Sequence, residues 1–232
     1  IGSVMEDSIT ATGCVVTKST IETHDVSGES GLAGGLIGYI SCEESADTTS
    51  TIESCEVTET TITVINSRDS AARANSEFIG GIGGEKNDNL FINNAKVEDN
   101  TFTETGVTEY KPLHKLVGGT RGEFNMNIDG VAYWTGLTYE LPKANAKGVI
   151  ELTKAGEFVT LVQEGVPANT KVTLKYNFDF MGAALTPVAV KEKFTEFQLD
   201  GANKTISNFT ITTEGTVAAL FPQVADAQFS NL

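Results

Sequence analysis

The sequence is poor in the residues that define several protein classes. Three cysteines in 232 residues are too few for a disulfide scaffold. The sequence contains no run of 18 apolar residues, so it predicts no membrane-spanning helix. Basic residues are also scarce, because 16 Lys and Arg stand against 31 Asp and Glu, for a net charge of −15. We therefore expect neither nucleic acid binding nor membrane insertion, and interpret the charge first as a source of solubility.

The start of the sequence carries no signal peptide. It reads Ile1-Gly2-Ser3-Val4, which resembles Ile37-Gly38-Tyr39-Ile40 further along the chain. We therefore expect the chain to be a mature or trimmed piece of a longer precursor that starts within a repeat.

The composition of the patterned segments predicts an all-β fold. Hydrophobic residues make up 40% of the chain and are spread along its whole length, which predicts a sizeable core. Thr, Val, Ile and Phe dominate the patterned segments, and Gly, Asn, Asp and Ser fill the gaps. The first group is typical of strands and the second of turns.

A glycine-rich motif recurs along the first half of the chain. Its first copy is Gly34-Gly35-Leu36-Ile37-Gly38, and further copies lie at residues 80 to 84 and 118 to 122. A second shared segment begins at Cys14, Cys55 and Ala95. The resulting period of about 40 residues indicates a solenoid, a propeller or an array.

Apolar residues alternate with Thr and Glu inside each copy, which predicts strands with one inward face. One copy cannot bury that face alone, so the copies are expected to stack as parallel sheets in a right-handed parallel β-helix. The predicted interior columns are Val16 with Val57 and Val97, and Ile21 with Ile62 and Phe102. Cys14 and Cys55 share one repeat position, which predicts stacked buried thiols and leaves open whether they form a disulfide.

Three parts are expected along the chain. Residues 1 to 122 form β-helical coils with the 40-residue period, residues 123 to 144 form a hairpin or cap, and residues 145 to 232 begin a second β-helical block. The glycine pairs are expected at tight corners between sheets, where a positive φ or a close approach is required. Tyr133, Trp134 and Tyr139 are expected to cover the open end of the first stack, with an aromatic carbohydrate platform as the alternative.

The second block is predicted as a series of short strands. They are expected at residues 149–152, 157–162, 171–176, 195–199, 204–212 and 217–221. Asp200-Gly201-Ala202-Asn203 predicts a turn. Ser207-Asn208-Phe209 and Ser230-Asn231-Leu232 lie 23 residues apart, which we interpret as one turn of a tighter β-helix.

Residues 172 to 232 resemble the leading segment of bacterial surface proteins that carry the glycine-rich GLUG motif. The similarity rests on Phe178-Asp179-Phe180, Pro187-Val188, the run from Phe197 to Phe209, and Ala219-Leu220-Phe221. Residues 34 to 38 are similar to the repeat itself, whereas Ala202, Asn203 and Pro222 depart from the family pattern. The resemblance implies a β-helical protein of Bacteroides-like bacteria, extracellular or on the outer cell surface, and is not tied to one activity.

No catalytic, metal-binding or cofactor-binding residue is assigned, because no cluster of carboxylates or of Asp and Arg recurs at equivalent positions. His24 and His114 lie in different copies without a partnered nucleophile. The acidic loop residues Glu43, Glu44, Asp47, Glu85 and Asp88 are interpreted as solvated, with calcium binding as the alternative.

Two surface features are weighed as further alternatives. Thr58, Thr60 and Thr63 are expected to face outward, but Lys18, Glu98 and Asn100 interrupt any flat array for ice or glycans. Ser8, Thr48 and Ser70 each follow an aspartate, as in the O-glycosylation acceptor of Bacteroides-like bacteria. Cys42 is expected in a loop, and residues 67 to 76 are the one place where a helical turn is expected.

The sequence therefore predicts a non-catalytic, secreted or cell-surface β-helical protein that acts as an adhesin, a stalk or a carbohydrate-binding module. Its expected partners are glycans or host and bacterial surface proteins. One alternative is a polysaccharide lyase or hydrolase fragment that lacks its catalytic coils. Another is a self-assembling fimbrial or surface-layer component, because open β-helix ends expose unpaired strands that favour end-to-end self-association.

Overall fold

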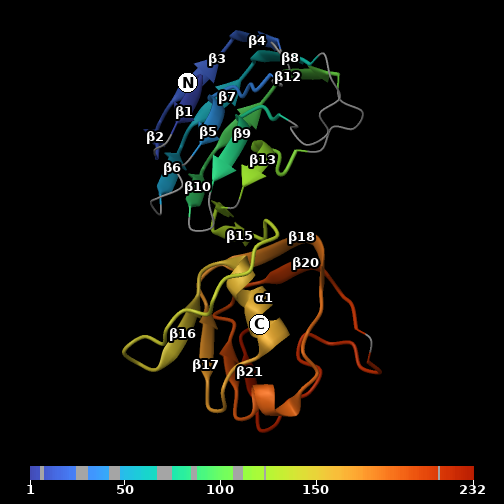
Figure 1. Ribbon diagram of the computed structural model, residues 1–232. Helices are drawn as coiled ribbons and strands as arrows, with labels where there is room; N and C mark the ends of the chain where they lie inside the picture. The colour runs from blue at the N-terminus through green and yellow to red at the C-terminus, as the bar shows by residue number, and fades with distance from the viewer. Residues whose placement is uncertain are drawn as a thin grey trace. The chain divides into compact units, whose positions relative to one another are not determined.

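The computed structural model describes residues 1–5, 8–24, 31–41, 48–66, 75–84, 88–106, 112–122, 124–213 and 215–232. The chain divides into two compact units, Ile1–Phe124 (unit 1) and Asn125–Leu232 (unit 2). Parallel strands dominate both units, and the described residues include a single α-helix (Figure 1). The predicted all-β class is confirmed.

Unit 1 is built from successive copies of the sequence repeat, here called coils, whose equivalent strands form parallel sheets. One set of equivalent strands is β1 (Ser3–Met5), β5 (Ile37–Ser41), β9 (Ile79–Gly84) and β13 (Val117–Gly122), and a second is β2 (Thr10–Thr12), β6 (Thr49–Glu53) and β10 (Asn89–Asn93). A third set is β3 (Val15–Thr17), β7 (Glu56–Thr58) and β11 (Lys96–Glu98). The fourth set is β4 (Thr20–His24), β8 (Thr61–Ile65) and β12 (Thr101–Thr105). Each strand pairs with its equivalent in the next coil, because one coil alone leaves its apolar face exposed.

The register of unit 1 confirms the predicted columns. Val57 pairs with Val16 and Val97, and Ile62 pairs with Ile21 and Phe102. The middle residue of each column is fully buried, whereas the outer two are half-buried. Burying such side chains contributes roughly 1.5–3 kcal/mol each, so these columns hold the coils together.

The corners of unit 1 repeat as faithfully as its strands. Gly13, Ser54 and Asn94 lie at one corner of successive coils, and Lys18, Glu59 and Asp99 lie at the next. All six adopt positive φ, between 49° and 62°. Gly13, Asn94 and Asp99 are of the types that adopt this conformation most readily, whereas Ser54, Lys18 and Glu59 adopt it against their preference. The stacking of the coils therefore imposes the corner geometry on these last three residues.

The glycine pairs were expected at such corners, and this position is wrong for the pairs at residues 80–81 and 118–119, which lie inside strands, whereas Gly34 and Gly35 lie just before β5. Gly80 also does not have a positive φ. The close approach that was expected as the other reason for glycine is confirmed, because a Cβ on Gly38 would lie 2.4 Å from the Gly2 carbonyl oxygen. A Cβ on Gly80 would lie 2.5 Å from backbone atoms of both Ala33 and Gly38. These glycines therefore allow backbone segments to touch within the core of unit 1.

A network of hydrogen bonds connects the chain that follows β8 to Glu104 of strand β12. Glu104 Oε1 accepts hydrogen bonds from Asn66 Nδ2 (3.1 Å) and Asn75 Nδ2 (2.8 Å). Asn66 Oδ1 accepts from the backbone N–H of Gly31, and Asn75 Oδ1 accepts from that of Ala33. Buried amides that are paired in this way avoid the cost of lost hydration. The predicted helical turn between Asn66 and Ser76 lies largely outside the described residues.

Unit 2 contains two sheets and one helix. One sheet has the order β14 (Asn125–Ile128), β15 (Val131–Tyr133), β18 (Asn177–Leu185) and β20 (Ile206–Ile211), and the other has β16 (Val149–Leu152), β17 (Lys171–Leu174), β19 (Gln198–Asp200) and β21 (Gln228–Ser230). Strands β14 and β15 form an antiparallel hairpin around Asp129 and Gly130, and the other pairs are parallel.

The spacing of equivalent residues in unit 2 is irregular, unlike that in unit 1. Val149 pairs with Lys171, Lys171 with Gln198, and Gln198 with Gln228. Ser207 pairs with Asp179 in one sheet and Ser230 with Asp200 in the other. The two Ser-Asn steps are therefore not equivalent positions, and the predicted turn of 23 residues is wrong.

Two predicted strands of unit 2 are also wrong. Residues 157–162 belong to helix α1 (Ala155–Glu164), and residues 217–221 form no strand. Ala155, Phe158, Val159 and Val162 have the i, i+3, i+4, i+7 spacing of a helix and are all buried. The apolar run is short enough to fit either element, which explains the error. Residues 195–199 only partly form β19, because a 3₁₀-helix, Lys191–Phe194, precedes them.

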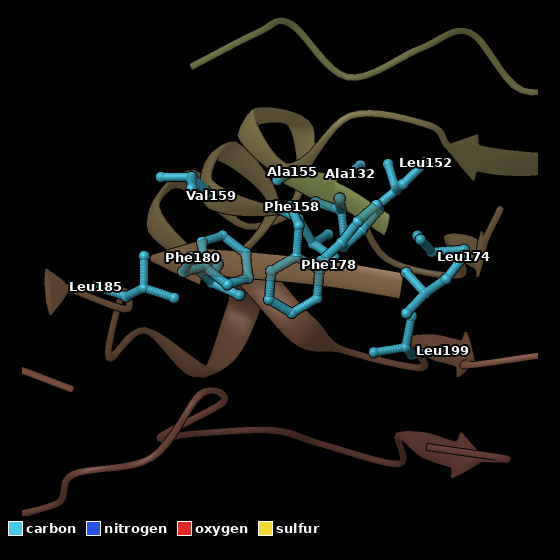
Figure 2. Packing of buried hydrophobic residues seen from close by; sticks show 14 of the residues in the cluster. Ala132, Leu152, Ala155, Phe158, Val159, Leu174, Phe178, Phe180, Leu185 and Leu199 are labelled. Carbon is cyan, nitrogen blue, oxygen red and sulfur yellow. The ribbon is translucent and has the colours of Figure 1, made fainter. Parts of the chain in front are cut away.

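Phenylalanine and leucine side chains make up much of the core of unit 2 (Figure 2). Phe158 of α1 packs against Phe178 and Phe180 of β18, with ring centroids 6.0 and 5.9 Å apart. Phe194, Phe197, Phe221 and Phe229 form a second aromatic group. The helix therefore closes one side of the core by covering the inward face of β18.

The start of α1 is held by the buried carboxylate of Glu157. Its Oε2 accepts the backbone N–H groups of Thr153 (2.7 Å) and Lys154 (3.0 Å). Burial raises the pKa of Glu157 above its ordinary value of 4.5, although these two hydrogen bonds partly offset the effect. The folded protein therefore holds this proton more tightly than the unfolded chain does.

That difference predicts a pH dependence of stability. Because the folded-state pKa of Glu157 is raised, the contribution of this group is fully present below pH 4.5 and declines as pH rises through the folded-state pKa. We expect Glu157→Gln to remove this decline, as measured by urea unfolding of unit 2 over a pH series. Glu164→Gln, at the exposed end of the same helix, is the control. Parallel pH profiles for the wild type and Glu157→Gln would contradict the assignment.

Candidate functional site

A groove of about 270 Å³ lies on the sheet β16-β17-β19-β21 of unit 2. Successive residues of a strand point to opposite faces of its sheet. Val172, Leu174 and Leu199 are buried in the core, so the residues that alternate with them face outward. The polar lining of the groove comes from Lys171, Thr173, Gln198, Asp200, Gln228 and Ser230.

The parallel register arranges this polar lining in two rows. Gln198 pairs with Lys171 on one side and Gln228 on the other, which forms the first row. The second row is formed in the same way by Thr173, Asp200 and Ser230. Adjacent strands lie about 4.8 Å apart, and residues two apart on one strand lie about 6.6 Å apart. The groove thus presents hydrogen-bonding groups at regular intervals in two directions.

Asp200 is the best-fixed side chain of the groove. Its Oδ1 accepts hydrogen bonds from Asn231 Nδ2 (2.9 Å) and the backbone N–H of Ala202 (3.0 Å). The bond from Asn231 is the main reason that the pKa of Asp200 lies below its ordinary value. Gly201 allows this arrangement, because a Cβ there would lie 2.3 Å from the Asn231 carbonyl oxygen. The predicted turn at residues 200 to 203 therefore serves to hold a charged carboxylate in place.

The side chains of the groove are suited to binding a polar ligand by hydrogen bonds. Its amide and hydroxyl groups can both donate and accept hydrogen bonds, while Lys171 supplies donors and Asp200 supplies acceptors. Glycoside hydrolysis uses a pair of carboxyl groups, one of them with a raised pKa. Among the described residues that line the groove, Asp200 is the one carboxylate, and its pKa is lowered. A ligand rich in hydroxyl groups suits such a surface.

The hairpin aromatics do not form a common platform. The indole N–H of Trp134 donates to the Leu137 carbonyl oxygen (2.7 Å), and its ring packs against Phe180. Tyr139 is buried, with the ammonium of Lys154 4.4 Å from its ring centroid. Tyr133 is half-buried. Its pKa is raised mainly by burial and, to a smaller extent, by the nearby charge of Asp179. The described contacts of Trp134 and Tyr139 thus lie within unit 2, and the alternative of an aromatic carbohydrate platform is not supported, because it needs exposed rings on one face.

The predicted acidic loops lie mostly outside the described residues. Glu43, Glu44, Asp47 and Glu85 fall there, as do Cys42 and Ser70. Asp88 is described and buried, and its Oδ1 accepts from Thr48 N–H (3.0 Å) and Thr48 Oγ1 (2.7 Å). In the part of the chain that the structure describes, no group of three or more His, Cys, Asp or Glu side chains could hold a metal ion.

The remaining candidates of unit 1 are placed as follows. His24 Nε2 lies 2.9 Å from Glu22 on the exposed strand β4, and His114 Nδ1 accepts from the Leu116 N–H. Thr60 is buried and donates to the Thr58 carbonyl oxygen, so its predicted outward position is wrong. Thr58 and Thr63 are half-buried. Ser8 is exposed, whereas Thr48 is half-buried against Asp88.

Comparisons with protein-family models, with curated proteins and with solved structures found no match for this chain. The resemblance to GLUG-motif proteins therefore remains a prediction. The described chain also has no helix with the length and apolar character needed to cross a membrane.

Proposed function

We propose that this chain is a non-catalytic, secreted or cell-surface protein that binds a glycan in the groove on β16-β17-β19-β21. The observation that carries the proposal is the pair of polar rows that run across these strands. Sugar rings display hydroxyl groups that donate and accept hydrogen bonds, and the amide, hydroxyl, ammonium and carboxylate groups of the rows complement them. The net charge of −15 disfavours polyanionic chains, so the ligand is a neutral glycan.

The same proposal includes the type of β-fold that each unit adopts. Parallel pairing between successive coils supports a parallel β-helix in unit 1 and a second β-helical block in unit 2. A right-handed winding is expected, because parallel crossover connections are right-handed in nearly all proteins. Such a fold suits an adhesin, a stalk or a carbohydrate-binding module of the GLUG type, because its sheets offer long, regular outer faces.

A binding measurement with groove variants tests the proposed function. A glycan array identifies a neutral ligand, and its affinity is then measured by titration calorimetry. Asp200→Asn keeps an oxygen for the Ala202 N–H but removes the charge, and we expect it to weaken binding about tenfold or more. Glu164→Gln is the control, because Glu164 is exposed at the end of α1 and does not line the groove. Absence of binding across the array, or equal affinity of Asp200→Asn and the wild type, would overturn the proposal.

A second candidate function is end-to-end self-association, which the first coil of unit 1 favours. Strands β1, β2, β3 and β4 each occupy the end of a sheet, so one edge of each is unpaired within the described chain. Ile1, Met5 and Val15 are among the exposed apolar side chains of this coil. Unpaired strand edges with exposed apolar residues promote pairing with another chain. The coil is therefore a surface on which a second copy could stack.

Light scattering over a concentration series tests this candidate. We expect the mass to rise with concentration, and Val15→Lys to suppress the rise, because a charge on an edge strand opposes pairing. Val217→Lys, at an exposed position of unit 2, is the control. A constant monomer mass at all concentrations would end the self-association candidate and leave glycan binding untouched.

A further inference from the structure

Cys14 and Cys55 lie at the same position of the first two coils of unit 1. Each comes one residue before a strand, and those strands start with the paired residues Val15 and Glu56. The Glu56 N–H donates to the Cys14 carbonyl oxygen (2.8 Å), so the parallel ladder includes the two cysteines. Neighbouring strands lie about 4.8 Å apart, which falls within the Cα separation that a disulfide spans, roughly 4.4–6.8 Å.

Each of the two sulfur atoms makes the same contact within its own coil. Cys14 Sγ donates to the Thr12 carbonyl oxygen (3.9 Å), and Cys55 Sγ donates to that of Glu53 (3.5 Å). Thr12 and Glu53 are themselves paired between the coils. Cys55 Sγ also lies 3.4 Å from the backbone nitrogen of Cys14. The side chains therefore take the same orientation, one coil above the other, and both are free thiols in this structure.

We propose that Cys14 and Cys55 form a modification site, at which a small-molecule disulfide such as oxidised glutathione converts the two thiols into a disulfide between the coils. The register places the two cysteines directly before adjacent strands, about 4.8 Å apart between Cα atoms, so the bond requires no change of pairing. It joins the first coil, whose strands have one unpaired edge, to the second coil, whose inward residues such as Val57 and Ile62 are fully buried. The proposal is independent of the glycan-binding function.

The reaction follows thiol–disulfide exchange. Cys14 is half-buried and Cys55 is buried, so the Cys14 thiolate attacks first and forms a mixed disulfide while one small thiolate leaves. The Cys55 thiolate then attacks the Cys14 sulfur, forms the Cys14–Cys55 bond and releases the second small thiolate. Two electrons pass from the protein to the reagent, and the two thiol protons end on the two released thiols. Burial raises the pKa of Cys55, which makes the second step faster as pH rises.

Oxidation of the full chain in a Cys42→Ser background tests the site, because this change removes the third thiol. Oxidised glutathione is expected to lower the mass by two hydrogens, to link the peptides of Cys14 and Cys55 in a digest, and to raise the melting temperature of unit 1 by roughly 5–15 °C. Dithiothreitol is expected to reverse all three changes.

The double variant Cys14→Ser/Cys42→Ser is the control, and its melting temperature is expected not to respond to the reagent. Three results would overturn the proposal: both thiols persist in excess reagent, glutathione stays attached to Cys14, or the new bond joins two chains. A melting temperature unchanged by a confirmed Cys14–Cys55 bond would overturn its stabilising role.

Discussion

Substituting Gly34 or Gly80 with alanine is expected to lower the free energy of unfolding of unit 1 by about 3 kcal/mol. A Cβ on Gly34 would lie 2.3 to 2.6 Å from backbone atoms of Ile37, Phe78 and Gly80. Backbone atoms of a stacked coil cannot move aside as the tip of a side chain can. The loss is measured by urea unfolding followed by far-UV circular dichroism.

Gly2→Ala is the matched control for this pair, because a Cβ at Gly2 meets nothing within 4 Å and its φ is not positive. We expect its unfolding free energy to stay within about 0.5 kcal/mol of the wild type. Equal stability of the Gly34→Ala and Gly2→Ala variants would show that the coils do not approach as closely as the structure indicates.

Truncating Phe158 to alanine is expected to cost unit 2 about 3–5 kcal/mol. The side chain is fully buried and joins α1 to Phe178 and Phe180 (Figure 2). Trp134 is the single tryptophan of the chain and packs on Phe180, so its fluorescence reports the unfolding of unit 2. A urea titration followed by this fluorescence measures the loss.

The same truncation at Phe229 provides the comparison, because that side chain is 42% exposed. Phe229 leaves a smaller cavity when it is removed, and we expect the loss to be less than half of that at Phe158. Losses of the same size at both positions would mean that α1 does not cover the core as described.

The register of unit 1 could be predicted because its repeat is nearly constant. Cys14, Cys55 and Ala95 start segments of almost equal spacing, and stacking like on like then determines each partner of Val57 and Ile62. The place of Gly80 inside a strand was missed, because a turn that needs a positive φ and a close backbone approach both select glycine.

Unit 2 could not be predicted to the same depth. Its equivalent residues, such as Val149, Lys171 and Gln198, are unevenly spaced, so no period shows which strands pair. Helix α1 interrupts the series with an apolar run as short as a strand. Apolar residues at positions i, i+3, i+4 and i+7 from Ala155 were the pattern that would have indicated this helix.

The groove also could not be predicted from the sequence, for a physical reason. Lys171, Gln198 and Gln228 are ordinary polar strand residues, and each has no functional signature alone. They form a row because three strands far apart in the chain pair side by side. Asp200 was recognised as part of a turn, but the bond from Asn231 that fixes its carboxylate depends on the same pairing.

The network of Asn66, Asn75 and Glu104 has a consequence for engineering. Asn66 and Asn75 stand at the two ends of the segment between β8 and β9, and both amides bond to one carboxylate on β12. Hydrogen bonds to Glu104, which lies outside this segment, thus fix both of its ends. An engineered version of unit 1 should therefore retain Glu104, because loss of this carboxylate would take a hydrogen-bond partner from two buried amides at once.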